Sequence, residues 1–538
     1  MEKICDKISK KANERVINLN KIYYGGSILT LSENLYTEAV LVSDGKIQAL
    51  GSLQELEAAS PDAEAVNLNG KCMMPAFIDP HSHLSQMAAA EKQISLNGAE
   101  SVSQISQRIN SFISQHKPPK GSWLMARDYD NNLLPESKNP GISELDSLAP
   151  GYKLIIHHKS GHMGLLNSEA LAALNIKAGD PSPAGGLIGT KNGELTGYLE
   201  ENAFFNALQS LPPEDPESLI ESYVKAQDKY AENGICLIQE GMFVRQMLPM
   251  LKALLESGSI KLPVRIYCDM DSYDDLQALL KKYDADVTVC GLKVYLDGSP
   301  QGRTAWMLEP YENSGDYCGY GSISDAQLIA AFKFAAENHL QLLAHCNGDA
   351  AAEQFLRCLE QAEQDYPKLS ALRPVIIHGQ LIKKEQLLRA KKLGACVSFF
   401  GAHVRYWGDV HVKNFGINRA SGISPANSAL KAGVNFTFHQ DSPVLPPNML
   451  ETVKIATERK TASSLLLGED ERISTLEALK AVTINAAWQY FEENLRGSLQ
   501  KGKEADFVIL SQDPLKAQDI EKITVESLYI HGEKYKFS

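Results

Sequence analysis

The sequence predicts an α/β protein: a (β/α)8 barrel with a long insertion after its first strand and a small β-sandwich domain built from both termini. Three observations lead to this prediction. Eight short apolar segments alternate with segments rich in helix-forming residues through the middle of the chain. The first of these segments ends near residue 81, and the second begins only near residue 234. Short β-like stretches with turn signals occupy the two ends of the chain.

The eight apolar segments are predicted to be parallel strands. Continuous apolar strands that alternate with helices are typical of a parallel sheet covered on both faces, and eight of them close a (β/α)8 barrel. Helix formers fill the spaces between them, as in AQLIAAFKFAAENH. We therefore expect the barrel over residues 76–491. Its strands are MMPAFIDPH, GICLIQEG, PVRIYCDM, CGLKVYLDG, QLLAHCNGD, PVIIHGQ, GACVSFF and GVNFTFHQD.

The terminal segments predict a composite β domain over residues 1–75 and 492–538. Asp44-Gly45 between two alternating apolar runs is a strong hairpin signal. A similar texture returns only at the far end, in ADFVILS and ESLYIHGEKYKF after the turn-rich GSLQKGKEAD. The simplest arrangement joins both ends in one domain; an independent N-terminal β domain is the alternative.

The interval between the first two strands predicts an insertion of about residues 88–225. It contains turn clusters near Pro118, Pro181 and Pro212. The loops that follow barrel strands shape the active-site end of such a fold, so we expect the insertion to lie over the barrel mouth.

Composition and charge exclude several classes of protein. Hydrophobic residues make up 44% and charged residues 22% of the 538 residues, which is ordinary globular usage. The net charge of −13 provides no electrostatic term for nucleic-acid binding. The nine cysteines include no CxxC pair, which favours a reduced compartment. The charged N-terminus has no signal-peptide pattern, and no apolar run is long enough to span a membrane, so we expect a cytoplasmic protein with no membrane or nucleic-acid partner.

Imidazoles and a carboxylate stand where the predicted strands end. His81 and His83 are two residues apart, so in an extended chain both can face one ion. His345, His378 and Asp441 follow the fifth, sixth and eighth strands. Each histidine alone is more often a core residue. Their joint occurrence at the carboxyl ends of four strands predicts a metal site, because these ends converge on one face of a barrel.

Lys293 lies inside the apolar fourth strand, GLKVYLDGS. Burial would lower its pKa and free the neutral amine, which can add carbon dioxide and become an anionic carbamate. The strand by itself favours the alternative of a lysine that reaches solvent at a strand edge.

Five segments resemble the amidohydrolase superfamily, and in particular the amidohydrolase 3 branch that includes N-substituted formamide deformylase. They are MPAFIDPHSHL, KVYLDGSPQGRTA, LLAHCNGDAA, VIIHGQLI and FTFHQDSPV. The resemblance extends over nearly the whole chain, including SGHMGLLNSEAL in the insertion and the closing GSLQKGKEADFVILSQDP. Ala76 stands where the family pattern has glycine, and Gln440 where a small residue is common; neither change removes a ligand.

The resemblance implies a metal-dependent hydrolase barrel with two divalent ions. By similarity, His81 and His83 bind one ion, a carbamate on Lys293 bridges both, and His345 and His378 bind the second. Asp441 contacts the first ion and handles the proton. Zinc suits this nitrogen and oxygen set best, and manganese, iron or cobalt could replace it.

Two ions that share a bridging water would lower its pKa and supply hydroxide near neutral pH. Asp441 would then take the water proton and pass it to the departing nitrogen. The predicted substrate is therefore a small-molecule amide.

Further residues are predicted around this centre. Asp79 and Asp297 lie on the strand faces of His81 and Lys293 and are expected in the layer beside the ligands, although either carboxylate could instead serve only to fix backbone. Substrate contacts are predicted for His162, Arg303, Asp128, Tyr129 and His403, with a loop hydrogen bond as the alternative for each.

The leading functional prediction is hydrolysis of a non-peptide C–N bond in an N-acyl or N-formyl amine by a metal-bound hydroxide. A deaminase or cyclic-amide hydrolase on the same site is the alternative among enzymes. A catalytically silent scaffold is the alternative outside enzymes, and the complete set of six ligand positions disfavours it. The small β domain leaves a homodimer as one expected oligomeric form.

Overall fold

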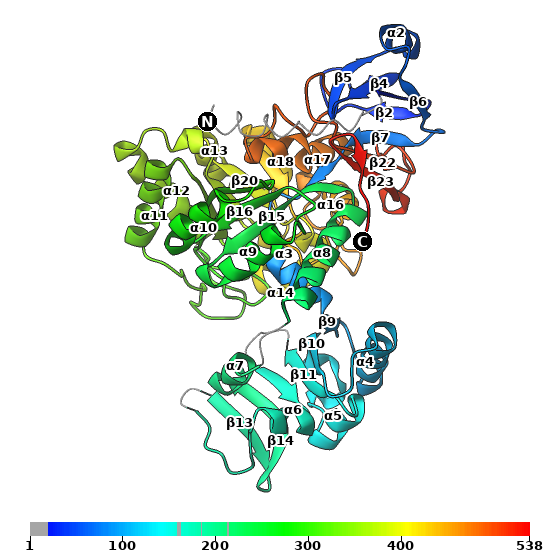
Figure 1. Cartoon of the computed structure of the whole chain (residues 1–538). Helices are drawn as coiled ribbons and strands as arrows, with labels where there is room; N and C mark the ends of the chain where they lie inside the picture. The colour runs from blue at the N-terminus through cyan, green and yellow to red at the C-terminus, as the bar shows by residue number, and fades with distance from the viewer. Residues whose placement is uncertain (1–19, 159–162, 184–185, 212–214) are drawn as a thin grey trace. The chain divides into compact units, whose positions relative to one another are not determined.

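The computed structural model describes residues 20–158, 163–183, 186–211 and 215–538. The chain divides into two compact units, one of residues 1–87 and 223–538 and one of residues 88–222 (Figure 1). Among the described residues, no helix combines the length and the apolar character needed to cross a membrane.

An eight-stranded parallel sheet forms the centre of the first unit. Neighbouring strands follow chain order and all seven pairings are parallel. Each of the eight predicted segments contributes one strand. They are β8 (Phe77–Ile78), β15 (Ile235–Phe243), β16 (Val264–Cys268), β17 (Val287–Tyr295), β18 (Gln341–Cys346), β19 (Val375–His378), β20 (Cys396–Phe399) and β21 (Phe436–Phe438).

The two ends of this sheet meet, as a barrel requires. The backbone N–H of His83, after β8, donates to the carbonyl of Ser442, after β21, at 2.9 Å. The strands are almost wholly buried, since helices follow them along the chain and pack outside them (Figure 1). The arrangement therefore fits a (β/α)8 barrel. The helices are α9 (Leu248–Glu256), α10 (Tyr273–Leu280), α11 (Asp325–Asn338), α12 (Asp349–Asp365), α13 (Lys384–Lys392), α14 (His403–Ala420), α15 (Ala426–Ala432), α16 (Met449–Glu458), α17 (Thr475–Ala481) and α18 (Ile484–Gln489).

Two smaller sheets lie in the same unit, and the larger of them contains strands from both ends of the chain. Strand β7 (Cys72–Pro75) pairs with β22 (Phe507–Leu510), so Figure 1 shows blue β7 beside the red C-terminal strands. The six-stranded sheet is completed by β24 (Glu533–Lys534), β23 (Val525–Ile530), β2 (Ser27–Leu29) and β3 (Tyr36–Thr37). The four-stranded sheet contains β5 (Lys46–Gly51), β4 (Ala39–Ser43), β1 (Lys21–Tyr24) and β6 (Glu64–Asn67), and α2 (Leu53–Ala59) packs on it.

The predicted hairpin at Asp44-Gly45 is confirmed. Strands β4 and β5 pair antiparallel with Ser43 opposite Lys46, so the loop has two residues. Both loop residues have positive φ, 49° and 73°, as the favoured two-residue turn requires. The two small sheets share one core, in which Tyr23, Val40 and Phe507 are buried together.

The second unit is a separately packed α/β structure. Its sheet has the order β13-β14-β12-β11-β10-β9, with parallel and antiparallel pairs. The strands are β9 (Gln93–Ser95), β10 (Trp123–Tyr129), β11 (Lys153–His158), β12 (Met163–Leu166), β13 (Gly186–Lys191) and β14 (Glu194–Glu201). The helices are α4 (Val102–His116), α5 (Ile142–Leu148), α6 (Ser168–Ala173) and α7 (Asn202–Gln209), while α3 (Leu84–Glu91) and α8 (Pro216–Glu232) lead into and out of the unit. The placement of this unit over the barrel mouth stays a prediction.

Candidate metal centre

The carboxyl ends of the parallel strands bring six predicted residues into one region. The strands carry some of these residues directly, and the loops that follow carry the others. His81 and His83 follow β8, Lys293 lies in β17, His345 lies in β18, His378 ends β19 and Asp441 follows β21.

His81, His83 and Asp441 form a tight cluster of ligand atoms. Nε2 of His81 lies 3.5 Å from Oδ1 of Asp441, and Nε2 of His83 lies 3.4 Å from the same oxygen. The three ligand atoms all lie within 4.8 Å of one another. Oδ1 of Asp441 is buried without a hydrogen-bond partner. An unsatisfied buried carboxylate oxygen facing two imidazole nitrogens fits a divalent cation.

Lys293 adjoins this cluster from the fourth strand. Its side chain is buried, and Nζ lies 3.0 Å from Nε2 of His81. Burial lowers the pKa of the amine to about 7, against the partial opposing effect of the Asp441 charge. A substantial fraction of the amine is therefore neutral near pH 7. A lysine that reached solvent at a strand edge would instead keep its amine protonated at this pH.

His345 and His378 lie beside the cluster. Their ring centroids are 4.6 Å apart, and Nε2 of His378 lies 4.0 Å from Oδ2 of Asp441. His378 and Asp441 both have positive φ, 74° and 53°. Such strain in residues other than glycine is uncommon and concentrates at functional sites.

Gln239 fixes the orientation of His81. The amide Nε2 of Gln239 donates to the carbonyl of Pro80, which can only accept, and to the hydroxyl of Tyr490, both at 2.8 Å. Oε1 of Gln239 therefore points at Nδ1 of His81, 2.7 Å away, and must accept a hydrogen bond from the N–H at that position. The lone pair of His81 is left on Nε2, the nitrogen that faces Asp441 and Lys293.

Asp297 does the same for His345. One carboxylate oxygen lies 3.0 Å from Nδ1 of His345 and also accepts from the backbone N–H of Asn347. The other accepts from the backbone N–H groups of Gly348 and Trp306. Because a carboxylate only accepts, Nδ1 of His345 carries the proton and the lone pair is left on Nε2, which lies 3.3 Å from the side-chain amide Nδ2 of Asn347. Asp297 thus fixes both the loop and the imidazole.

His439 forms a hydrogen bond with Nδ1 of His378. Its Nε2 lies 3.1 Å from Nδ1 of His378, and its Nδ1 lies 2.8 Å from the hydroxyl of Ser398. Burial lowers the pKa of His439 to about 3, so this imidazole is neutral. With its proton on Nδ1, His439 would donate to Ser398 and accept from His378, which leaves Nε2 of His378 facing Asp441.

Asp79 contacts backbone rather than an imidazole. Its Oδ1 accepts from the backbone N–H of His81 at 3.2 Å, and Oδ2 is buried without a partner. Burial raises the pKa of Asp79 to about 8. Of the two roles considered for this carboxylate, the geometry favours the structural one.

The predicted substrate-contact residues belong to both units. His403 is buried, with Nδ1 3.1 Å from Nε2 of His411. Arg303 follows β17 and donates through Nε to Asn414. Asp128 pairs with Arg127 at 2.6 Å within the second unit.

The other two contact predictions also concern the second unit. The hydroxyl of Tyr129 donates to Asn139 at 2.9 Å. His162 lies outside the described residues. A substrate role for all five residues stays a prediction.

Sequence reasoning did not single out Gln239, Ser398 or His411. Gln239 could have been found by the rule that found the histidines, since QE ends an otherwise apolar predicted strand. Ser398 and His411 give no such signal, because their importance arises from contacts with other histidines.

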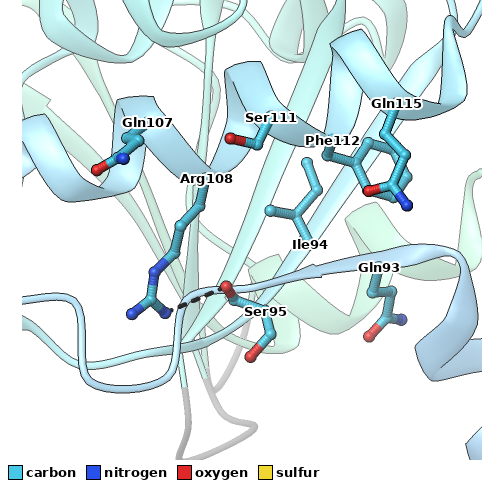
Figure 2. A pocket seen from close by; sticks show the side chains of 8 residues that line it. All are labelled: Gln93, Ile94, Ser95, Gln107, Arg108, Ser111, Phe112 and Gln115. Atoms are coloured by element: carbon cyan, nitrogen blue, oxygen red, sulfur yellow. Dashed lines mark hydrogen bonds between the residues drawn. The ribbon is translucent and has the colours of Figure 1, made fainter.

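A shallow hollow in the second unit is lined by fewer residues that could bind a metal or catalyse a reaction. Figure 2 shows the side chains of β9 and α4 that line it, with Nη1 of Arg108 donating to the carbonyl of Ser95 at 3.3 Å. Arg108 is the one charged residue among the eight that line this hollow. The histidine and carboxylate cluster of the first unit is therefore the better candidate site.

Comparison with known proteins identifies the family. The family model described as "Amidohydrolase family" matches residues 64–534, most of the chain. A second model, of the bacterial imidazolonepropionase-like composite domain, matches residues 39–63.

The chain belongs to the amidohydrolase family.

Two relatives agree with this assignment, and a solved structure agrees with the fold. YtcJ of Bacillus subtilis (strain 168) is 26% identical over 96% of this chain and 99% of its own length. N-substituted formamide deformylase of Arthrobacter pascens is 25% identical over 93% of this chain and 95% of its own length. A metal-dependent hydrolase from Pyrococcus horikoshii OT3 shares the fold with a TM-score of 0.77 at 23% identity, over 94% of this chain and 99% of its own.

Membership makes this amidohydrolase a hydrolase of carbon–nitrogen bonds and implies a divalent metal. The donor set fits that implication. Gln239 and Asp297 place the proton of His81 and of His345 on Nδ1. His439 can do the same for His378. In each ring the lone pair is then on Nε2, where it could bind a metal.

Proposed function

We propose that this amidohydrolase cleaves a non-peptide C–N bond in a small N-acyl or N-formyl amine. The observation that carries the proposal is the cluster of His81, His83 and Asp441, whose carboxylate oxygen is buried and unsatisfied. The similarity to N-substituted formamide deformylase over 93% of the chain supports an N-formyl or N-acyl substrate.

The metal would be held by the six converging residues. His81, His83 and Asp441 would bind one ion, and His345 and His378 a second, with a carbamate on Lys293 between them. Zinc suits these imidazole nitrogen and oxygen ligands. When bound, such ions polarise an acyl oxygen and lower the pKa of coordinated water.

The protein's own groups would then manage the proton and the charge. Burial alone would raise the pKa of Asp441, but contact with His83 and the nearby imidazoles of His378 and His81 lowers it well below its usual value. An ionised Asp441 can accept a proton from the attacking water and return it to the leaving nitrogen, which is a poor leaving group until it is protonated. A carbamate on Lys293 would add the negative charge that two dications need.

The cellular setting is also proposed. All eight described cysteines are free thiols, which supports a reducing compartment and hence a cytoplasmic enzyme. A homodimer stays the proposed oligomeric form.

Purified protein loaded with zinc would be assayed for metal content and for turnover of a panel of N-formyl, N-acyl and cyclic amides. We expect two ions per chain and amine release from an N-formyl or N-acyl substrate. Ammonia release from an aminated ring would instead indicate a deaminase. Metal-loaded protein that hydrolyses no amide would contradict the proposal.

The matched variant is Asp441→Asn, which keeps the size of the side chain and removes the proton acceptor. We expect kcat to fall by about 10²- to 10⁴-fold, the usual contribution of a general base, with the thermal midpoint little changed. Activity within a few-fold of the unmodified enzyme would refute the proton role.

A further inference from the structure

A second pair of histidines lies next to the candidate metal centre without belonging to it. His403 begins α14 directly after β20, and His411 lies two turns further along the same helix. His403 is 4% exposed and His411 is fully buried. The ring of Phe400 contacts His403 at 4.7 Å and His439 at 5.3 Å between centroids, so the pair adjoins the histidine that contacts His378.

The two imidazoles are joined by a well-aligned hydrogen bond. Nδ1 of His403 and Nε2 of His411 are 3.1 Å apart, and the ring planes differ by only 5°. The centroids are 5.3 Å apart, much further than the nitrogens, so the coplanar rings meet edge to edge. One nitrogen must donate and the other must accept.

The burial of His411 indicates which nitrogen donates. Its second nitrogen, Nδ1, is buried and has no hydrogen-bond partner among the described residues. A buried N–H without an acceptor is among the rarest and costliest features of a protein interior, whereas a bare lone pair costs less. The proton of His411 is therefore favoured on Nε2, where Nδ1 of His403 accepts it.

The position of the His411 proton determines which nitrogen of His403 is protonated. With Nδ1 accepting, a neutral His403 must carry its proton on Nε2. Burial, together with the neighbouring His411, lowers the pKa of His403 well below its usual value, so the ring is neutral. Nε2 of His403 has no hydrogen-bond partner among the described side chains. It is also not one of their fully buried polar atoms that lack a partner.

We infer that His411 is a positioning residue that donates to Nδ1 of His403, and that His403 consequently presents its Nε2–H as a hydrogen-bond donor to the acyl oxygen of the substrate. The first half concerns only the two imidazoles. The second half rests on the proposed amide hydrolysis, in which the acyl oxygen gains negative charge as water adds to the carbonyl.

The proton positions can be measured directly. Protein labelled with ¹⁵N-histidine would be examined by long-range ¹H–¹⁵N correlation, with His403→Gln and His411→Gln variants to assign the two rings. We expect protonated Nε2 and bare Nδ1 in His403. A proton on Nδ1 of His403 would overturn the inference, and this readout holds even if every amide tested proves not to be a substrate.

Kinetics of an isosteric pair of variants test the direction of the bond. The amide of His411→Gln can still donate to His403, whereas the carboxylate of His411→Glu can only accept and would reverse the tautomer. We expect kcat/KM to stay within a few-fold in His411→Gln and to fall about 10²-fold in His411→Glu, as when one oxyanion donor is lost.

The matched control is His116→Glu, which makes the same change on the exposed face of α4 and should leave activity unchanged. The reverse order, with Glu active and Gln impaired, would contradict the inference. Equal loss in both variants, or no loss in either, would also count against it.

Discussion

At the scale of single residues, the candidate centre depends on which nitrogen of each imidazole carries a proton. Gln239 and Asp297 determine this for His81 and His345, because each presents an oxygen that can only accept. The Nε2 atoms that are predicted to bind metal therefore keep their lone pairs in the protein by itself. This preorganisation is a property of the protein, and removing it should weaken metal binding without removing a ligand.

Substitution of Gln239 tests this preorganisation. Gln239→Leu keeps the approximate volume of the side chain and removes the acceptor for Nδ1 of His81. We expect metal affinity to fall by about 10- to 100-fold, the usual effect of losing a partner behind a metal ligand. Competition with a chelator measures it. Gln354→Leu, at another buried glutamine that contacts Asp325 rather than an imidazole, is the control, and equal affinities in all three proteins would refute the role.

The buried amine of Lys293 makes a second prediction, for pH. Its pKa of about 7 means that the amine is protonated below pH 7 and neutral above it. Only the neutral form of the amine can add carbon dioxide. When metal-free protein is activated with zinc at a fixed concentration of dissolved carbon dioxide, the rate of activation should therefore fall by about tenfold per pH unit below pH 7. Lys293→Gln should not respond to carbon dioxide at any pH. An activation rate independent of pH between 5 and 8 would count against a carbamate.

At the scale of elements, the close pairing of β17 with β18 positions Lys293 beside the histidines. Gly291 lies opposite Gln341 in this pair, two residues before Lys293. A Cβ at Gly291 would lie 1.9 Å from the carbonyl oxygen of Gln341, a backbone atom that cannot move without shifting the strand. The absence of a side chain at residue 291 is therefore a requirement of the site as well as of the sheet.

Gly291→Ala should consequently separate the two strands. We expect the free energy of unfolding to fall by about 1–3 kcal/mol, the usual cost of overpacking, together with a loss of metal affinity as Lys293 and His345 move apart. Urea denaturation and metal titration measure the two effects. Gly422→Ala is the control, because a Cβ there meets nothing closer than 3.4 Å. Unchanged stability in Gly291→Ala would show that β17 tolerates the displacement.

At the scale of the whole molecule, the sequence predicted the parallel sheet well because buried parallel strands leave a strong apolar signal. The eight segments all formed strands, and the six residues predicted to be ligands lie at one end of the sheet. The position of Gln239 at the end of a predicted strand could have marked it as a site residue, but the partners of the supporting residues were not predictable. Gln239 meets His81 and Ser398 meets His439 only after strands distant in sequence are paired, and no local pattern encodes such contacts.

A buried chain of ion pairs links the barrel sheet to the small β sheets of the same unit. Arg265 in β16 lies 2.5 Å from one oxygen of Glu492, and Arg496 lies 2.7 Å from the other. Arg496 also pairs at 2.8 Å with Asp506, next to β22. The side chains of these four residues are at most 8% exposed. Glu492 is thus the shared anion of two buried guanidinium groups.

Glu492→Gln should destabilise the unit without touching the metal centre. The variant keeps the shape of the side chain but leaves Arg265 with only the partly exposed Asp286 and Arg496 with only Asp506. Breaking a buried pair costs about 3–5 kcal/mol, since the remaining charge stays desolvated. Urea denaturation should show this loss. Glu477→Gln, which breaks the more exposed pair with Lys480, should cost at most about 1 kcal/mol. An equal loss of unfolding free energy in the two variants would mean that the buried chain of ion pairs contributes no more than a surface pair. Apolar packing, such as that of Leu528 in the barrel core, would then hold the sheets together instead.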